Sequence, residues 1–160
     1  MAAGAWVVPN KAKLNLTQVI DTTNVRTLLN PANTFKIVLL TSSFTPSDGD
    51  TGNEVYADLT NELSTAYGYT AGGLTLTGVT VTMSSGVVKF TASNAVWTAS
   101  GGSIPAWRYA YIYASGTFSS KVNPIVAHFL GDSTPADVPA TTTGTTLTVT
   151  PSGSGILSYT

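Results

Sequence analysis

Short runs of alternating apolar and polar residues recur along the chain, with turn-forming residues between them. A period of two is typical of strands with one buried face, because successive side chains point to opposite sides of a pleated sheet. In the run 34–40 (TFKIVLL), Phe35, Ile37 and Leu39 share one face. About eight strands are predicted in this way, over residues 34–40, 74–83, 87–92, 95–98, 107–114, 124–130, 145–150 and 156–159.

Two of these strands are predicted to form a single hairpin. The run 74–83 (LTLTGVTVTM) changes phase at Gly78, which indicates a bulge or a bend. Residues 84–86 (SSG) form a three-residue connection with glycine at its last position, as a bulged hairpin requires. The whole segment 74–92 is therefore interpreted as one hairpin.

Few segments have the pattern of a helix. Residues 56–64 (YADLTNELS) place Leu59 and Leu63 four positions apart, which predicts one short helix or turn. The segment 11–29 is a second helix candidate, weakened by its threonine and asparagine content.

Regularly spaced short strands with so little helix predict an all-β fold, an antiparallel β-sandwich or jelly-roll-like domain with one or two short helices. The chain of 160 residues is long enough to bury a core without disulfides. Residues 1–16 are expected to form an extended N-terminal arm, and residues 17–160 a single β-sandwich domain.

The balance of charges excludes several kinds of partner. The chain has 7 Lys and Arg and 8 Asp and Glu, a net charge of −1, and is instead rich in threonine and serine. So small a charge provides no field that attracts phosphate backbones or anionic lipid, so neither a nucleic-acid nor a membrane partner is expected. A nearly neutral protein also has weak colloidal protection, which favours packing against other copies.

Cysteine is absent, which excludes disulfides, thiolate nucleophiles and thiolate metal sites. The segment 1–13 lacks the pattern of a signal peptide, because its apolar stretch ends at Pro9 and its lysines follow that stretch. We therefore expect synthesis in the cytoplasm of the host, with any extracellular role reached by release and not by secretion.

Residue types that support catalysis are scarce. His128 is the sole histidine, and the alternation in 124–130 predicts for it a strand position with one packed face and a structural or interface role. The sequence has no G-x-S-x-G motif to supply a nucleophile. No enzymatic activity and no cofactor is therefore expected.

Three polar or glycine-rich motifs have competing interpretations. The run Asp48–Glu54 (DGDTGNE) could wrap a hard cation such as calcium, or it could be a solvated loop. The run 68–73 (GYTAGG) lacks the lysine and spacing of a phosphate loop, and is interpreted as a tight entry into the next strand. Asp58 and Glu62 could share a helical face, a spacing typical of solvated surfaces.

Aromatic residues alternate in 107–114 (WRYAYIYA). Trp107, Tyr109, Tyr111 and Tyr113 are predicted to project from one face of a strand. That face could belong to the core, to a protein interface or to a sugar-binding surface, since aromatic rings serve in all three. Arg108 is predicted to reach solvent or a carboxylate at the edge of the domain, because burying it unpaired would be costly.

Several segments, taken in order along the chain, together resemble one family. They are VVPNKAK at 7–13, NTFKIVLLTSSFTP at 33–46, YADLTNEL at 56–63, GYTAGG at 68–73, VWT at 96–98, WRYA at 107–110 and PIVAHF at 124–129. Their order and spacing over about residues 7–159 resemble small β-rich structural proteins of tailed bacteriophages, described as virion, capsid-decoration or tail-associated proteins. The resemblance implies a non-enzymatic module and no catalytic residue.

This resemblance implies a capsid decoration (cement) protein of the virion that binds the major capsid protein on the outside of the head, as a homo-oligomer with a trimer favoured. A tail or neck component, or a receptor- or glycan-binding tail tip that uses Trp97, Trp107 and the tyrosines, are the alternatives. The arm is the first candidate to reach a neighbour, because Trp6 has no evident core partner. The expected interface residues are Trp6, Val7, Val8, Trp107, Tyr109, Tyr111 and Tyr113.

Overall fold

The computed structural model describes residues 4–11, 28–49, 52–118, 120–134 and 136–159. Every pairing between its named strands is antiparallel, and its named helix is a single 3-10 turn, so the predicted all-β class is confirmed. The elements are β1 (Thr34–Leu40), η1 (Tyr56–Asp58), β2 (Leu74–Thr75), β3 (Thr80–Ser84), β4 (Val87–Thr91), β5 (Ala95–Thr98), β6 (Tyr109–Ser115), β7 (Thr117–Phe118), β8 (Lys121–Val122), β9 (Ile125–Leu130), β10 (Thr146–Val149) and β11 (Leu157–Tyr159).

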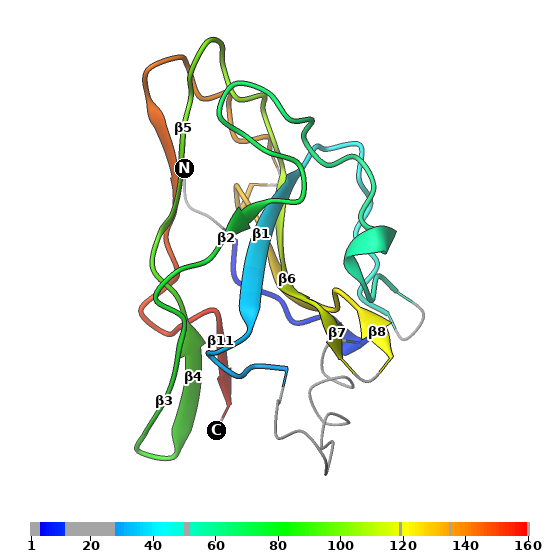
Figure 1. Cartoon of the computed structure of the whole chain (residues 1–160), viewed down its shortest axis with the longest axis vertical. Helices are drawn as coiled ribbons and strands as arrows, with labels where there is room; N and C mark the ends of the chain where they lie inside the picture. Colours follow the sequence, from blue (N-terminus) through cyan, green and yellow to red (C-terminus); the bar gives the residue numbers. More distant parts are fainter. Residues whose placement is uncertain (1–3, 12–27, 50–51, 119, 135, 160) are drawn as a thin grey trace.

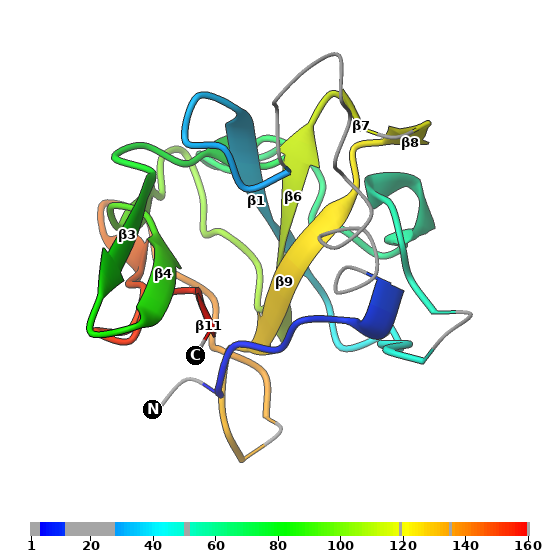
Figure 2. The same ribbon diagram turned by 90° about the horizontal axis from the view of Figure 1, so that it is seen from below.

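The main sheet has the strand order β2-β1-β6-β9 (Figures 1 and 2). β1 and β6 pair along their whole length, from Thr34 opposite Ser115 to Leu40 opposite Tyr109. The register between β6 and β9 shifts at Ile112 and Tyr113, a bulge that gives β9 one extra residue. β1, β6 and β9 consist largely of buried residues, so neither face of this sheet is open to solvent in its centre.

Two smaller sheets, β10-β5 and β11-β4-β3, form the second layer (Figure 2). β4 runs on into β5 and pairs with β11, whereas β5 pairs with β10, which comes before β11 in the chain. The two sheets are therefore successive parts of one antiparallel ladder. The ladder is interrupted where the stretch from Phe90 to Ala95 faces the longer stretch from Val149 to Leu157. The extra residues loop out and are closed by a turn, in which Gly155 N donates to Ser152 O over 2.8 Å.

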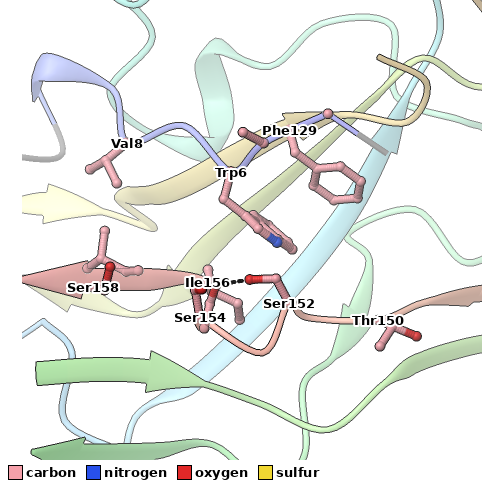
Figure 3. A pocket seen from close by; sticks show the side chains of 12 residues that line it. Trp6, Val8, Phe129, Thr150, Ser152, Ser154, Ile156 and Ser158 are labelled. Atoms are coloured by element: carbon pink, nitrogen blue, oxygen red, sulfur yellow. Dashed lines mark hydrogen bonds between the residues drawn. The ribbon is translucent and has the colours of Figure 1, made fainter. Parts of the chain in front are cut away.

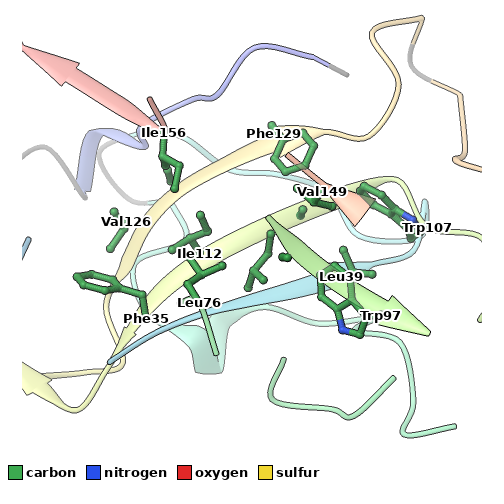
Figure 4. Packing of buried hydrophobic residues seen from close by; sticks show 14 of the residues in the cluster. Phe35, Leu39, Leu76, Trp97, Trp107, Ile112, Val126, Phe129, Val149 and Ile156 are labelled. Carbon is green, nitrogen blue, oxygen red and sulfur yellow. The ribbon is translucent and has the colours of Figure 1, made fainter. Parts of the chain in front are cut away.

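The core lies between the two layers (Figure 4). Phe35 of β1 meets Phe90 of β4 edge to face, with ring centroids 4.9 Å apart. Trp97 of β5 stacks against Tyr69, with centroids 6.3 Å apart. These contacts join β1 to β4, and β5 to the loop that carries Tyr69, through large buried aromatic rings.

A second apolar cluster covers the opposite face of the main sheet. Tyr111, Tyr113 and Ile125, with Val38 and Leu40, pack there against side chains of the segment 41–63, chiefly Phe44 and Leu59. Phe44 meets the Tyr111 ring edge to face, with centroids 5.5 Å apart. The segment 41–63 therefore acts as a third layer without strands of its own.

The prediction of a single hairpin over 74–92 is wrong. β2 pairs with β1 in the main sheet, whereas β3 pairs with β4 in the second layer. Gly78 lies between them with φ +59°, and a Cβ at this position would lie 2.3 Å from Ser93 Oγ. The β3–β4 connection has two residues and not three: Ser85 and Gly86 have φ of +50° and +79°, as a type I′ turn requires.

Of the short helix or turn predicted in 56–64, the structure has the turn, η1. Asn61 has φ +60°, a left-handed conformation in which an α-helix cannot continue. Leu59 and Leu63 consequently pack into different clusters. The candidate helix 11–29, and the expected boundary between residues 16 and 17, lie mostly outside the described residues.

The β7–β8 hairpin is not predicted by the alternation, because two-residue strands are too short to show a period.

Within the described residues, no helix has the length and apolar character needed to cross a membrane.

We expect Phe90→Ala to lower the free energy of unfolding by about 3–5 kcal/mol, because it removes a buried ring and leaves a cavity between the layers. Urea denaturation followed by tryptophan fluorescence measures this loss. Val96→Ala, at an exposed position of β5, is the control and should change stability by less than about 0.5 kcal/mol. A loss below about 1 kcal/mol for Phe90→Ala would contradict the packing described above.

Candidate functional site

The described part of the N-terminal arm pairs with the edge of β9. Gly4 N donates to Leu130 O over 2.8 Å, and Val7 and His128 exchange two backbone hydrogen bonds of 2.6 and 2.8 Å. The arm therefore continues the main sheet beyond β9 and occupies an edge that would otherwise be open.

Trp6 has a core partner, contrary to the expectation from sequence. Its ring lies against Phe129, with centroids 4.3 Å apart, and it is only partly buried. Val8 also packs against the main core, whereas Val7 is 40% exposed. Of the three arm residues expected at an interface, Val7 presents the most side chain to solvent.

A groove of about 630 Å³ separates the arm from residues 150–158, which comprise the looped-out residues and the start of β11. Trp6 reaches across it from the arm toward Ser152 and Ile156 (Figure 3). The lining combines the Trp6 and Phe129 rings with the hydroxyl groups of Ser152, Ser154 and Ser158, and it contains no charged side chain. The groove can hold neutral apolar or hydroxylated groups but supplies neither an acid nor a base. These serines were not predicted as site residues, because most of them lie in a segment with the composition of a loop.

The four aromatic residues of 107–114 do not share one face, so that prediction is wrong. Trp107 precedes β6, bridges to Val138 and lies in the main core, whereas Tyr111 and Tyr113 lie in the second cluster. All three are nearly inaccessible to solvent, and Tyr109 is partly buried against the same second cluster. Trp97 is buried as well. These rings therefore form no surface for a partner or a sugar in the chain as folded.

Glu62 is the centre of a hydrogen-bond network that joins Tyr56, Tyr69 and, through Gly72, Tyr113. Tyr56 Oη donates to Glu62 Oε2 over 2.5 Å, and Tyr69 Oη donates to Glu62 Oε1 over 2.6 Å. Gly72 N donates to the same Oε1 over 2.8 Å, and Tyr113 Oη donates to Gly72 O over 2.7 Å. Burial, together with the adjacent carboxylate, raises the pKa of Tyr56 and of Tyr69 far above the ordinary value for tyrosine. Both phenols therefore stay protonated and keep donating, which makes Glu62 a structural anchor and not a solvated surface residue.

Three close contacts pair other ionisable side chains of the described residues. Glu54 Oε2 lies 2.9 Å from Lys121 Nζ, and Asp48 Oδ1 lies 2.8 Å from His128 Nε2. Arg108 Nε lies 2.8 Å from Asp137 Oδ1 at the edge of the domain, as predicted. No group of three potential metal ligands occurs in the described ranges. Residues 50 and 51 of the candidate cation run Asp48–Glu54 lie outside those ranges.

His128 occupies the buried strand position predicted for it, in β9. Its ring stacks on Tyr111 with centroids 4.6 Å apart and planes inclined by 11°. Burial lowers the pKa of His128 below the ordinary 6.5, although the Asp48 carboxylate opposes this shift. Nε2 lies against Asp48, whereas Nδ1 has no hydrogen-bond partner among the described residues. A neutral imidazole explains both observations, because its Nε2–H donates to Asp48 and its Nδ1 carries no proton.

Comparisons with known proteins add no assignment: no family model matches the chain, and neither a curated protein nor a solved structure matches it significantly.

Acidification should destabilise the protein through His128. Its pKa is lower in the folded than in the unfolded chain, so below pH 6.5 the unfolded chain binds more protons. The contribution of His128 to the free energy of unfolding is therefore fully present above pH 6.5, and it is lost as the pH falls from there through the lowered pKa of the folded chain. Melting temperatures between about pH 8 and about pH 5.5 measure the effect.

His128→Gln is the matched control, because its amide can still donate to Asp48 but does not titrate. The chain has a single histidine, so the wild-type protein minus this variant isolates the contribution of His128. Identical pH dependence in both proteins would show that His128 has the same proton affinity folded and unfolded.

Proposed function

We propose that this chain is a structural protein of the virion of a tailed bacteriophage, a cement protein that binds the outside of the assembled head. The observation that carries the proposal is that, in the described residues, ionisable side chains pair with one another within the chain while several apolar side chains are exposed to solvent. Three such pairs tie loops to the sandwich. Large apolar side chains, in contrast, are exposed on peripheral elements: Val7 on the arm, Val81 and Met83 on β3, Val96 on β5 and Val122 on β8.

This distribution suits attachment by buried area. A cement protein that binds the major capsid protein only in the mature shell stabilises that shell by mass action. Apolar contacts of this kind are little affected by ionic strength, unlike contacts between charged surfaces. The resemblance of the ordered sequence segments to phage structural proteins points to the same class of protein, and it implies no catalytic residue.

A receptor- or glycan-binding tail tip is the second candidate, favoured by the groove beside Trp6. An aromatic ring next to several hydroxyl groups is a common arrangement for stacking and hydrogen bonding a sugar. The platform first expected for this function, with Trp97, Trp107 and the tyrosines, is buried, so the groove would have to replace it. A tail or neck component is the third possibility, and the location of the protein on the particle separates all three.

Immunogold electron microscopy should locate the protein over the head. Antibody raised against the recombinant chain is applied to intact virions of the phage that encodes it, with pre-immune serum as the control. Dense label over the head is the expected result. Label confined to the tail or its tip would reject the cement function, and particles without label would reject a virion protein of any kind.

The affinity for heads should depend little on salt. Heads prepared without the protein are titrated with it, and we expect its dissociation constant to change by less than about threefold between about 50 mM and about 500 mM NaCl. Co-sedimentation measures the bound fraction. A steep, log-linear loss of binding would show that charged contacts dominate and would contradict attachment by apolar area.

A further inference from the structure

β3 is a sheet edge that lacks the usual protection against pairing. It pairs with β4 on one side, and no described strand lies on its other side. All five residues, Thr80–Ser84, are exposed, and none of them is charged or a proline. Natural proteins normally protect such an edge with lysine, proline, a bulge or a covering segment. Figures 1 and 2 both place the β3–β4 hairpin at the periphery of the molecule.

The exposed edge also carries an apolar face. Val81 lies opposite Phe90, which is buried and lies opposite Leu157 in turn, so these residues form one row across the three strands. Val81 is 39% exposed and Met83, two positions along the same face, is 76% exposed. The apolar face of the second layer therefore extends beyond the part that the main sheet covers.

The direction of the backbone groups on β3 follows from its turn. In a hairpin with a two-residue loop, the closing pair, here Ser84 and Val87, exchanges both hydrogen bonds. Because hydrogen-bonded and non-hydrogen-bonded pairs alternate along an antiparallel ladder, Val81 and Phe90 form a pair without hydrogen bonds to each other. In agreement, Phe90 O accepts a hydrogen bond from Ile156 N, on the side away from β3. The N–H and C=O groups of Val81 and Met83 therefore point outward, toward the free edge.

We infer that a second copy of this chain pairs with this edge, β3 against β3, antiparallel about a twofold axis at Thr82. In this register Val81 of each copy lies opposite Met83 of the other, and the two Thr82 residues face each other. The outward groups of Val81 and Met83 then form four backbone hydrogen bonds, and the apolar row becomes continuous across six strands. An edge strand paired antiparallel with its own copy is complementary in its backbone groups by symmetry, and β3 has no charged residue that would repel the same residue of that copy, which favours a second copy over an unrelated chain.

Charge does not oppose this pairing. The net charge of the chain is −1, and the nearest charged side chain, Lys89, lies on β4 opposite Thr82. The two Lys89 residues would be separated by three strand spacings, about 14 Å, which exceeds the Debye length of about 8 Å at physiological salt. A contact of one strand pair is smaller than the roughly 1,200 Å² of stable complexes, so the dimer should be weak in dilute solution and is best detected by trapping.

Disulfide trapping tests this register directly, since the wild-type chain has no cysteine. Thr82→Cys should form a disulfide dimer under mild oxidation, because paired residues without mutual hydrogen bonds have Cα atoms about 4.5 Å apart, within disulfide range. Thr80→Cys is the matched control, on the same face of the same strand. Its two copies would be about 14 Å apart, so we expect it to cross-link at least about tenfold more slowly.

Charge substitutions in the Thr82→Cys background supply the second measurement. Val81→Lys or Met83→Glu alone should slow cross-linking by about tenfold, and the two together should restore it, because each lysine then faces a glutamate of the other copy. Circular dichroism checks that each variant is folded. Equal rates for the two cysteine variants, faster cross-linking at position 80, or no recovery in the double-charge variant would each overturn the inference, whereas head labelling of virions would be unaffected.

Discussion

Burial of both faces of β1, β6 and β9 is the constraint on which the rest of this structure depends. A sheet whose central strands are apolar on both sides needs two covers. The second layer supplies one through Phe90 and Trp97, and the segment 41–63 supplies the other through Phe44 and Leu59. The two covers have different physical characters: the first is a pair of sheets with its own backbone hydrogen bonds, and the second is an irregular segment that must be fixed by side chains.

The need to fix that segment explains where the scarce charges are found. Tyr56 in this segment and Tyr69 after it both donate their phenol hydrogens to Glu62. The phenol of Tyr111, on the covered face of β6, is buried and has no hydrogen-bond partner among the described residues, so the cover over Tyr111 itself is purely apolar and aromatic. Asp48 and Glu54 hold the same segment to β9 and β8 through His128 and Lys121. The chain thus uses most of its described carboxylates for internal attachment.

Alternation in the sequence predicted the positions of most strands but not their partners. The bounds of β1 and β5 agree with the prediction, because a period of two identifies a pleated segment with one buried face. The same period says nothing about which strand lies alongside, so β2 and β3 were assigned to one hairpin although they belong to different layers. Alternation also groups Trp107 with the tyrosines, but Trp107 lies before β6 and bridges to Val138, a pairing that the pattern does not reveal. The contact between Asp48 and His128, far apart in sequence, and the groove beside Trp6 depend on tertiary folding alone.

The interruption of the second-layer ladder has an evolutionary consequence. Much of the wall of the groove opposite Trp6 is made from residues between β10 and β11, where the stretch 149–157 exceeds its partner stretch 90–95. These intervening residues belong to no strand, whereas Leu157 and Ser158 of the same wall pair with β4. Insertions or deletions there would change the length of this wall while the registers of β5 with β10 and of β4 with β11 stay the same. Lineages of this fold could therefore alter what the groove accommodates by indels alone, without substituting a single core residue.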